Sequence, residues 1–309
     1  MELIVGASQP SLSRVHPPER GALRVGLVQH RWRSEGLADV LLDAIGQAAE
    51  AGAQIVFLPE ITLIRYPADI APTAAPGDTA EDLQTGPTMT LARAAATRFG
   101  IHVHASLYEK VEGPDGLGFN TAVLLAPDGR LVGRTRKTHI PITAGYHEDK
   151  FFRAGPARAD GQDPYPVHEA LGARLGLPTC WDEWFPEVAR AYGLAGADIL
   201  AYPTAIGSEP DHPDFDTEPL WRAVITGHAI ANGLFIVVPN RTGAEGLNTF
   251  YGSSFIVDPY GRLLVQAPRE TEAVLVADLD LDQRRDWLDL FPFFTTRRPD
   301  TYGPLIGPA

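Results

Sequence analysis

Apolar residues occur along the chain in short segments of two kinds. Residues 23–28 are mostly apolar and residues 54–58 are apolar after the first position, which is typical of buried parallel strands. Between them, residues 38–51 carry apolar positions at helical spacing, and Gly52 follows where a glycine would end a helix. Strand, helix and strand in this order predict a βαβ unit and therefore an α/β fold.

The second half of the chain repeats the pattern of the first. Residues 51–55, Ala-Gly-Ala-Gln-Ile, recur as Ala-Gly-Ala-Asp-Ile at 195–199. A turn sequence that ends in Gly-Arg-Leu follows in each half, at 126–131 and at 258–263. Landmarks that recur in the same order indicate an internal duplication. Each half also contains a second helix and a strand after it, predicted at 88–99 and 101–108 and at 220–232 and 234–239.

Two such halves predict a four-layer fold. A sheet whose helices cover one face needs an apolar layer on the other face, and the matching half can supply it by packing sheet on sheet. We therefore expect an internally duplicated αββα sandwich, formed as one domain by residues 21–288. Residues 1–20 are rich in proline and have no sustained period, so we expect an N-terminal extension outside the core.

The C-terminal tail, residues 289–309, carries the apolar cluster Leu-Phe-Pro-Phe-Phe at 290–294. Such a cluster is too apolar to remain exposed on a monomer. We expect a homo-oligomer, a dimer or larger, in which the tail contacts a partner subunit. The alternative is a tail that folds back on its own core.

Composition narrows the possible partners. The 309 residues are 44% apolar and 21% charged, as in ordinary globular chains, and the net charge is −13. A chain of this sign repels phosphate backbones and anionic lipids, so we expect neither nucleic acid nor a membrane as a partner. Cys180 is the only cysteine, which excludes an intramolecular disulfide and favours a cytoplasmic location.

Three reactive side chains are predicted at the carboxyl ends of strands, where α/β folds gather functional groups. Glu60, Lys137 and Cys180 each follow a predicted strand. A helix start and a nearby lysine favour the thiolate form of a cysteine, the form that acts as a nucleophile. A carboxylate can act as a general base, and a fixed ammonium can stabilise an oxyanion. The alternatives are a small buried cysteine, a solvated glutamate and a lysine on a basic strand.

The segments around these residues resemble the motifs of the nitrilase superfamily of carbon–nitrogen hydrolases. They are Phe-Leu-Pro-Glu at 57–60, Arg-Lys-Thr-His-Ile-Pro at 136–141 and Thr-Cys-Trp-Asp-Glu-Trp-Phe-Pro-Glu at 179–187. The resemblance implies an αββα fold and a catalytic set of Glu60, Lys137 and Cys180, with Glu148 matching a second glutamate. It also implies a reaction that uses neither a cofactor nor a metal.

Within the superfamily, residues 145–151 and 202–210 are most similar to the N-carbamoylputrescine amidases. The resemblance implies hydrolysis of a terminal carbamoyl or amide C–N bond, here of N-carbamoylputrescine to putrescine, carbon dioxide and ammonia. Residues 61–66 depart from this branch at a place that borders the substrate pocket in the family. A β-ureidopropionase-like enzyme, or another hydrolase of small aliphatic amides, therefore stays open as an alternative.

Five further residues are expected to contact the substrate: Tyr66, His139, Trp181, Glu183 and Trp184. Superfamily members that cleave carbamoyl amino acids resemble one another in having arginine three residues after the nucleophile, where this chain has Glu183. An acidic residue at this position favours a neutral or cationic small-molecule substrate. The alternative is that Glu183 lies in a subunit contact or pairs with an arginine, without meeting the substrate.

Two functions of other classes stay open. A non-catalytic binding protein could keep this scaffold, and a metal-dependent phosphohydrolase could use a similar sandwich. Ammonia release from a ureido compound distinguishes an enzyme from the first, and activity that survives a chelator excludes the second. Residues 211–216 contain His and Asp, but a proline-rich loop is typical of solvated side chains, so no metal site is expected there.

Overall fold

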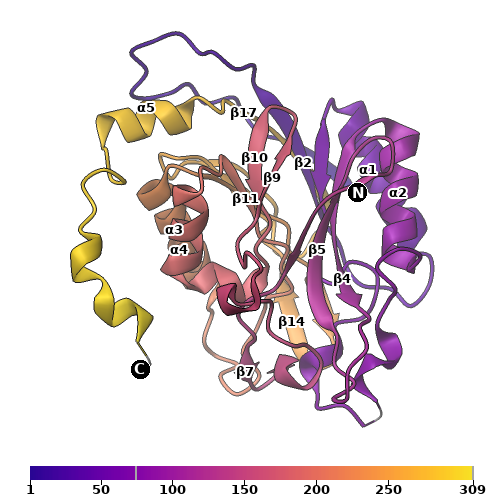
Figure 1. Cartoon of the computed structure of the whole chain (residues 1–309). Helices are drawn as coiled ribbons and strands as arrows, with labels where there is room; N and C mark the ends of the chain where they lie inside the picture. Colours follow the sequence, from indigo (N-terminus) through magenta and orange to yellow (C-terminus); the bar gives the residue numbers. More distant parts are fainter. Residues whose placement is uncertain (74, 308–309) are drawn as a thin grey trace.

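Two β-sheets pack face to face in the computed structural model, which describes residues 1–73 and 75–307 (Figure 1). The first sheet has the strand order β1 (Glu2–Val5), β17 (Ala273–Leu279), β2 (Leu23–Gln29), β3 (Ile55–Phe57), β4 (His102–Glu109), β5 (Phe119–Leu125), β6 (Leu131–Arg136). The second has the order β16 (Leu263–Gln266), β15 (Phe255–Val257), β12 (Phe235–Val238), β11 (Ile199–Ala201), β10 (Ala173–Gly176), β9 (Val167–Ala170).

Helices cover the outer face of each sheet. The first sheet is covered by α1 (Leu37–Glu50) and α2 (Pro87–Phe99), and the second by α3 (Pro186–Leu194) and α4 (Glu218–Asn232). The predicted four-layer αββα sandwich is therefore confirmed. None of the helices in the described residues is both long enough and apolar enough to cross a membrane.

The remaining elements are short or terminal. Two hairpins are formed by β7 (Ile142–Thr143) with β8 (Tyr146–His147) and by β13 (Thr242–Glu245) with β14 (Asn248–Tyr251). Helix α5 (Gln283–Leu290) leads into the C-terminal tail. The 3-10 helices are η1 (Pro67–Asp69), η2 (Pro76–Thr79), η3 (Glu148–Lys150), η4 (Arg158–Asp160), η5 (Cys180–Trp184), η6 (Pro299–Thr301) and η7 (Gly303–Ile306).

The predicted duplication is visible in the strand order. The strands β2, β3, β4, β5 and β6 are neighbours in this order in the first sheet, as β10, β11, β12, β15 and β16 are in the second. The repeated Ala-Gly-Ala sequence ends α1 and α3, where Gly52 and Gly196 have φ angles of 90° and 83°. Glycine adopts such angles at little cost, so the same residue type follows the end of both helices.

Both faces of the central strands are buried. Along β3, Ile55 and Phe57 face the second sheet, whereas Val56 faces the helices α1 and α2. Leu175 and Val237 of the second sheet belong to the same core cluster as Ile55 and Phe57. This burial on both faces explains why the segment is a continuous apolar run rather than an alternating one.

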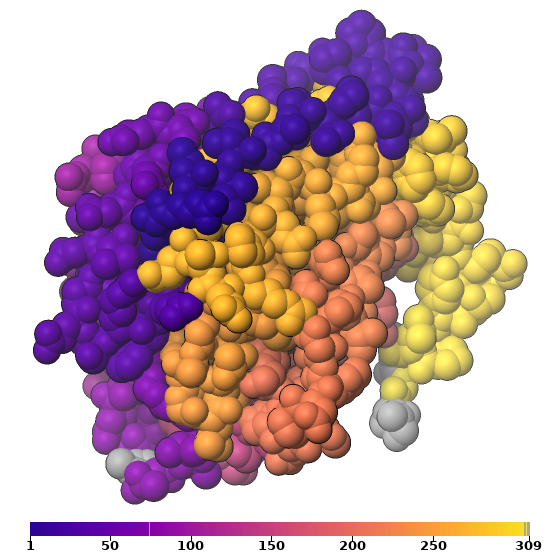
Figure 2. Space-filling view, turned by 180° about the vertical axis from the view of Figure 1, so that it is seen from behind, coloured from indigo at the N-terminus to yellow at the C-terminus, as the bar shows by residue number. Residues whose placement is uncertain are grey.

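The expected separation of the chain into a core and an extension needs correction. Strand β17 comes from the end of the second half, yet it lies in the first sheet, antiparallel to β2. Residues 1–20 are not wholly outside the core, because β1 pairs with β17 as a parallel edge strand. The segment then crosses the C-terminal part of the chain (Figure 2), where Arg14 binds Asp286 and Arg20 binds Asp282.

The C-terminal tail begins by folding back on its own subunit. The rings of Phe291 and Phe293 stack at 5.8 Å beside Trp287. The guanidinium of Arg284 lies 5.6 Å from the ring centre of Phe294. Phe291 still has 45% of its surface exposed. The homo-oligomer therefore stays a prediction, as does a cytoplasmic location.

Candidate active site

Three strand ends bring reactive side chains together. Glu60 follows β3, Lys137 follows β6 and Cys180 follows β10. All three residues are buried, with exposed fractions of 0%, 1% and 5%. Glu148, the first residue of η3, joins them and is exposed by only 1%. The sequence therefore identified a set of side chains that are close in space.

Lys137 lies between two carboxylates. Its Nζ is 2.9 Å from Oε1 of Glu60 and 2.7 Å from Oε2 of Glu148. Asn120 donates a hydrogen bond of 2.7 Å to Oε1 of Glu60, whereas the buried Oε2 has no partner within the described residues. Burial alone would lower the pKa of the Lys137 ammonium, but the two carboxylates raise it well above its ordinary value. The lysine therefore stays charged, and Oε2 of Glu60 is free to accept a proton.

Glu148 is a carboxyl that titrates near neutral pH. Burial raises its pKa, Lys137 lowers it and Glu60 raises it again, and the resulting pKa is about 7. The hydroxyl of Tyr66 donates a hydrogen bond of 2.7 Å to Oε1 of Glu148. Both oxygens of this carboxyl are therefore held in place while its charge changes.

Cys180 begins η5 in a backbone conformation that side chains rarely adopt. Its φ angle is 41°, and its N–H donates to the carbonyl of Pro203 at 3.1 Å. Burial raises the pKa of the thiol well above its ordinary value, Glu60 raises it further and Lys137 opposes both. The prediction of a favoured thiolate is wrong for this site, because burial and the nearby carboxylate of Glu60 outweigh the effect of Lys137. The thiol needs a base before it can attack.

Asp182 connects the cysteine loop to the lysine loop. Its carboxylate accepts hydrogen bonds from the N–H of Thr179 at 3.1 Å and from the N–H of His139 at 2.9 Å. Nδ1 of His139 lies 2.7 Å from the same carboxylate, and the imidazole stacks on Phe185 at 3.8 Å. These contacts hold the loop after β10 against the loop after β6.

A cavity opens beside Cys180. Its volume is about 140 Å³, below the roughly 300–1,000 Å³ of sites for drug-sized ligands. The residues that line it are Pro141, Thr143, Tyr146, Glu148, Cys180, Trp181, Trp184, Ile206 and Glu209. The cavity therefore suits a small molecule that presents a carbonyl group to the sulfur.

A family model described as carbon–nitrogen hydrolase matches residues 24–289. The chain belongs to this family. It is 35% identical to citrullinase from Francisella tularensis, over 92% of this chain and 98% of that protein. It is 37% identical to N-carbamoylputrescine amidase from Arabidopsis thaliana, over 74% of this chain and 76% of that protein. A solved carbon–nitrogen hydrolase from Helicobacter pylori has a TM-score of 0.82 at 30% identity, over 93% of this chain and 99% of that one.

The family confirms the predicted superfamily and the predicted class of reaction. The protein is a hydrolase that acts on non-peptide C–N bonds. Of the five expected substrate contacts, Trp181 and Trp184 line the cavity of the hydrolase. Tyr66 and His139 do not; Tyr66 is fully buried behind Glu148, and His139 faces Asp182. Tyr66 and His139 thus support the carboxylates of the site, and direct contact of these two with substrate stays a prediction.

Glu183, expected as an acidic contact for the substrate, also lies outside the cavity wall. Its Oε1 accepts a hydrogen bond of 2.8 Å from the indole N–H of Trp221, and its buried Oε2 has no partner within the described chain. Burial raises the pKa of Glu183 well above its ordinary value, more than the Trp221 bond lowers it. Burial therefore disfavours the charged form of Glu183, and the argument for a cationic substrate cannot depend on its charge.

Some residues of the site were not identified from the sequence. Asn120 reaches Glu60 from β5, and this contact depends on the register of β5 against its neighbours, which no spacing shows. Ile206 and Glu209 line the cavity of the hydrolase. Both fall in residues 202–210, which carried the family resemblance, and that resemblance was the signal that could have identified them.

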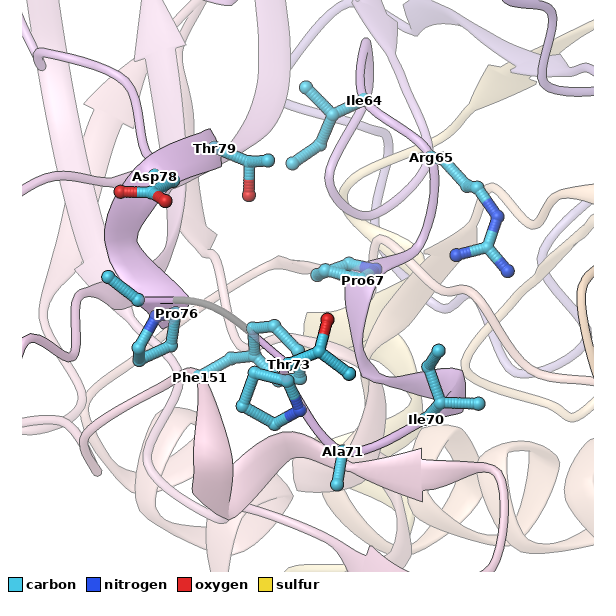
Figure 3. Close-up of a pocket in the computed structure, with 12 residues that line it drawn as sticks. Ile64, Arg65, Pro67, Ile70, Ala71, Thr73, Pro76, Asp78, Thr79 and Phe151 are labelled. Atoms are coloured by element: carbon cyan, nitrogen blue, oxygen red, sulfur yellow. The ribbon is translucent and has the colours of Figure 1, made fainter.

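A second hollow of about 340 Å³ lies apart from these reactive groups. Figure 3 shows its wall, which is mostly proline, isoleucine and threonine, with Arg65 and Asp78 on opposite sides. Arg65 is already paired with Asp69. The described residues of this wall include neither a cysteine nor a lysine. We therefore place the candidate active site in the smaller cavity, which Cys180 lines.

Proposed function

We propose that this hydrolase removes the terminal carbamoyl group of a small ureido-alkylamine, with N-carbamoylputrescine as its substrate. The observation that carries the proposal is the charge of the cavity wall. Among the described residues that line it, the acidic side chains are Glu148 and Glu209, and none is an arginine or a lysine. Such a wall favours a substrate that ends in an ammonium group over one that ends in a carboxylate. The net charge of −13 acts in the same direction at long range.

In the proposed reaction, Oε2 of Glu60 takes the thiol proton of Cys180, and the sulfur attacks the carbamoyl carbon. Lys137 and the backbone N–H of Trp181 stabilise the oxyanion. The bond to the terminal nitrogen then breaks, and the proton moves from Glu60 to that nitrogen, so that ammonia leaves. A water molecule activated by Glu60 cleaves the thioester, and the carbamate that is released decomposes to carbon dioxide and the amine.

Citrulline is a second candidate substrate, and the similarity to citrullinase from F. tularensis favours it. Citrulline has the same terminal carbamoyl group, so the four reactive residues would act on it in the same way. Its other end carries a carboxylate beside the ammonium. The described residues of the cavity wall include no arginine or lysine to bind that carboxylate. We therefore place citrulline second.

Ammonia release from N-carbamoylputrescine, citrulline and N-carbamoyl-β-alanine, measured under the same conditions, tests the proposal. We expect the highest kcat/KM for N-carbamoylputrescine and the lowest for N-carbamoyl-β-alanine. A preference for N-carbamoyl-β-alanine contradicts the charge argument but leaves the thiol chemistry standing. If none of the three releases ammonia and Cys180 does not react with an alkylating reagent, the alternative of a binding protein is favoured.

A further inference from the structure

Arg241 is a fully buried cation that lies outside the cavity wall. It follows β12, and its guanidinium points at the loop that begins with Glu60. Nε and Nη2 donate to the carbonyl of Glu60 at 3.2 and 3.0 Å. Nη2 also donates to the carbonyl of Ile64 at 2.8 Å and to the carbonyl of Ile61. One side chain therefore binds three carbonyls of the loop that carries the proposed base.

The loop needs such support because its backbone is strained at Ile61. The φ angle of Ile61 is 47°, which a β-branched residue adopts only when its surroundings impose it. From the sheet side, Ser106 Oγ accepts a hydrogen bond from the N–H of Ile61 at 3.0 Å. From the other side, the carbonyl of Ile61 is bound by Arg241. The direction in which Glu60 leaves the sheet is thus fixed from both sides.

Glu245, on β13, completes the arrangement. Its two oxygens accept hydrogen bonds of 2.9 and 2.8 Å from Nη1 of Arg241. Oε2 of Glu245 also accepts a hydrogen bond of 3.0 Å from the N–H of Tyr66. The hydroxyl of Tyr66 in turn holds Glu148. Arg241 and Glu245 together therefore hold both ends of the segment 60–66. Through these ends they hold the two carboxylates that bind Lys137.

We propose that Arg241 and Glu245 are positioning residues that set the distance between Glu60 and Glu148 around Lys137. The inference rests on the proposed function, because it assigns the pair to the reaction of Cys180 rather than to folding alone. The two residues come from the second half of the duplicated chain, whereas Glu60 comes from the first half. The geometry of the site thus depends on a contact between the two halves.

The test uses Arg241→Lys, which keeps the charge but cannot bind a carboxylate and three carbonyls at once. A misplacement of about 1 Å costs about 100-fold in rate, so we expect kcat to fall about 100-fold. KM should change by less than about threefold, because Arg241 does not line the cavity in which the substrate binds. Alkylation of Cys180 by iodoacetamide, which needs no substrate, should also become slower because Glu60 is displaced.

Arg262→Lys is the matched control. Like Arg241, Arg262 pairs with a buried carboxylate four residues away in the sequence, that of Asp258, at 2.7 Å. Its guanidinium also binds the carbonyl of Pro10 in the N-terminal segment and not the loop after Glu60. This variant should lose thermal stability while kcat and the alkylation rate stay at the wild-type value. If Arg241→Lys does not fold, the positioning role is tested with Glu245→Gln, which keeps the size of the side chain and one acceptor oxygen. The kcat of this variant should fall about tenfold, because Glu60 is displaced by less than in Arg241→Lys.

The outcomes separate the inference from the proposed function. If wild-type Cys180 is alkylated and the folded Arg241→Lys or Glu245→Gln variant reacts at the wild-type rate, the positioning role is overturned and the proposed function stands. If the wild type releases no ammonia from the three ureido compounds and its Cys180 is not alkylated, the proposed function and the positioning role are both overturned. Parallel losses of stability and of activity in the Arg262→Lys control would mean that loss of any arginine–carboxylate pair has this effect, which also overturns the inference.

Discussion

Nζ of Lys137 lies 2.7 Å from Oε2 of Glu148, a carboxyl with a pKa of about 7. The same ammonium is 2.9 Å from Glu60. One buried cation therefore faces two carboxylates, and the trio carries a net negative charge when both are ionised. Burial, and after it the charge of Glu60, explains why Glu148 takes up a proton near neutral pH. The two carboxylates also mean that Lys137 keeps its own proton and acts as a fixed positive charge for a developing oxyanion.

The first prediction concerns the nucleophile. Replacing Cys180 with serine should lower kcat by at least about 100-fold, because a hydroxyl is a much weaker nucleophile than a thiolate and loss of a nucleophile costs orders of magnitude. Thermal unfolding should be nearly unchanged, since the two side chains have similar size. A folded Cys180→Ser variant that releases ammonia at a rate close to the wild type would exclude covalent thiol catalysis.

The second prediction compares the two carboxylates. Oε2 of Glu60 has no partner within the described residues, whereas both oxygens of Glu148 are already bound. Glu60→Gln should therefore lower kcat by about 100-fold or more, as the loss of a general base does, and Glu148→Gln should lower it less. Both rates are measured with the same substrate at saturation. The reverse order would show that Glu148, and not Glu60, takes the thiol proton.

The third prediction is a pH dependence of stability. The pKa of Glu148 is raised from 4.5 to about 7 in the folded protein, so the folded state binds this proton more tightly than the unfolded chain. Its stabilising contribution is complete below pH 4.5 and is lost as the pH rises through 7. With about 1.4 kcal/mol per pKa unit, the loss is on the order of 3 kcal/mol.

Urea unfolding at about pH 5 and about pH 8 measures this effect, because the difference between the two free energies contains the contribution of the titrating carboxyl. The wild type and Glu148→Gln share all other titrating groups, so the comparison isolates one side chain. The wild type should lose more stability than the variant between the two pH values. The same change in both proteins would mean that Glu148 does not carry a raised pKa.

Much of the architecture could be predicted from the sequence because it depends on local signals. The repeated Ala-Gly-Ala segments identify two helix ends, and Glu60 closely follows an apolar run that predicts a buried strand. The position of β17 could not be predicted in this way. Its apolar residues suit the inner face of either sheet, and only the completed fold decides that it pairs with β2.

The details of the site depend on contacts between distant segments, and these leave no pattern in the sequence. Arg241 binds the loop after Glu60 across 181 residues, and Trp221 binds Glu183 across 38 residues. Glu183 illustrates the consequence. Its position three residues after the nucleophile is evident from the sequence, but its burial, which raises the pKa of its carboxyl, is not.

The fourth prediction follows from the burial of Glu183 outside the cavity wall, which raises the pKa of its carboxyl. A glutamine has the same size and can accept the indole N–H of Trp221 as the acid does. Glu183→Gln should therefore keep kcat and KM within about threefold of the wild type, since the residue lies outside the cavity wall and the bond to Trp221 is kept. Glu183→Ala, which leaves the Trp221 N–H unpaired in a buried place, should be clearly less stable in thermal unfolding. A rise in KM of tenfold or more for Glu183→Gln, measured with an ammonium-bearing substrate, would show that the residue is ionised after all.

The last prediction assigns the recognition of substrate charge to Glu209. This carboxyl lines the cavity and is half-buried, and burial raises its pKa above the ordinary 4.5. The kinetics are therefore measured at about pH 8, where a carboxyl is more fully ionised than at neutral pH. Glu209→Gln should raise KM for N-carbamoylputrescine about tenfold, the usual effect of losing one partly desolvated ion pair, and should leave kcat nearly unchanged. A neutral substrate such as an N-alkylurea should be cleaved equally well by both proteins.

Asp211→Asn, which removes the same charge from the same loop outside the cavity wall, is the control for long-range attraction. If Asp211→Asn raises KM as much as Glu209→Gln does, the general negative field of the protein attracts the substrate, and no specific contact with Glu209 is needed.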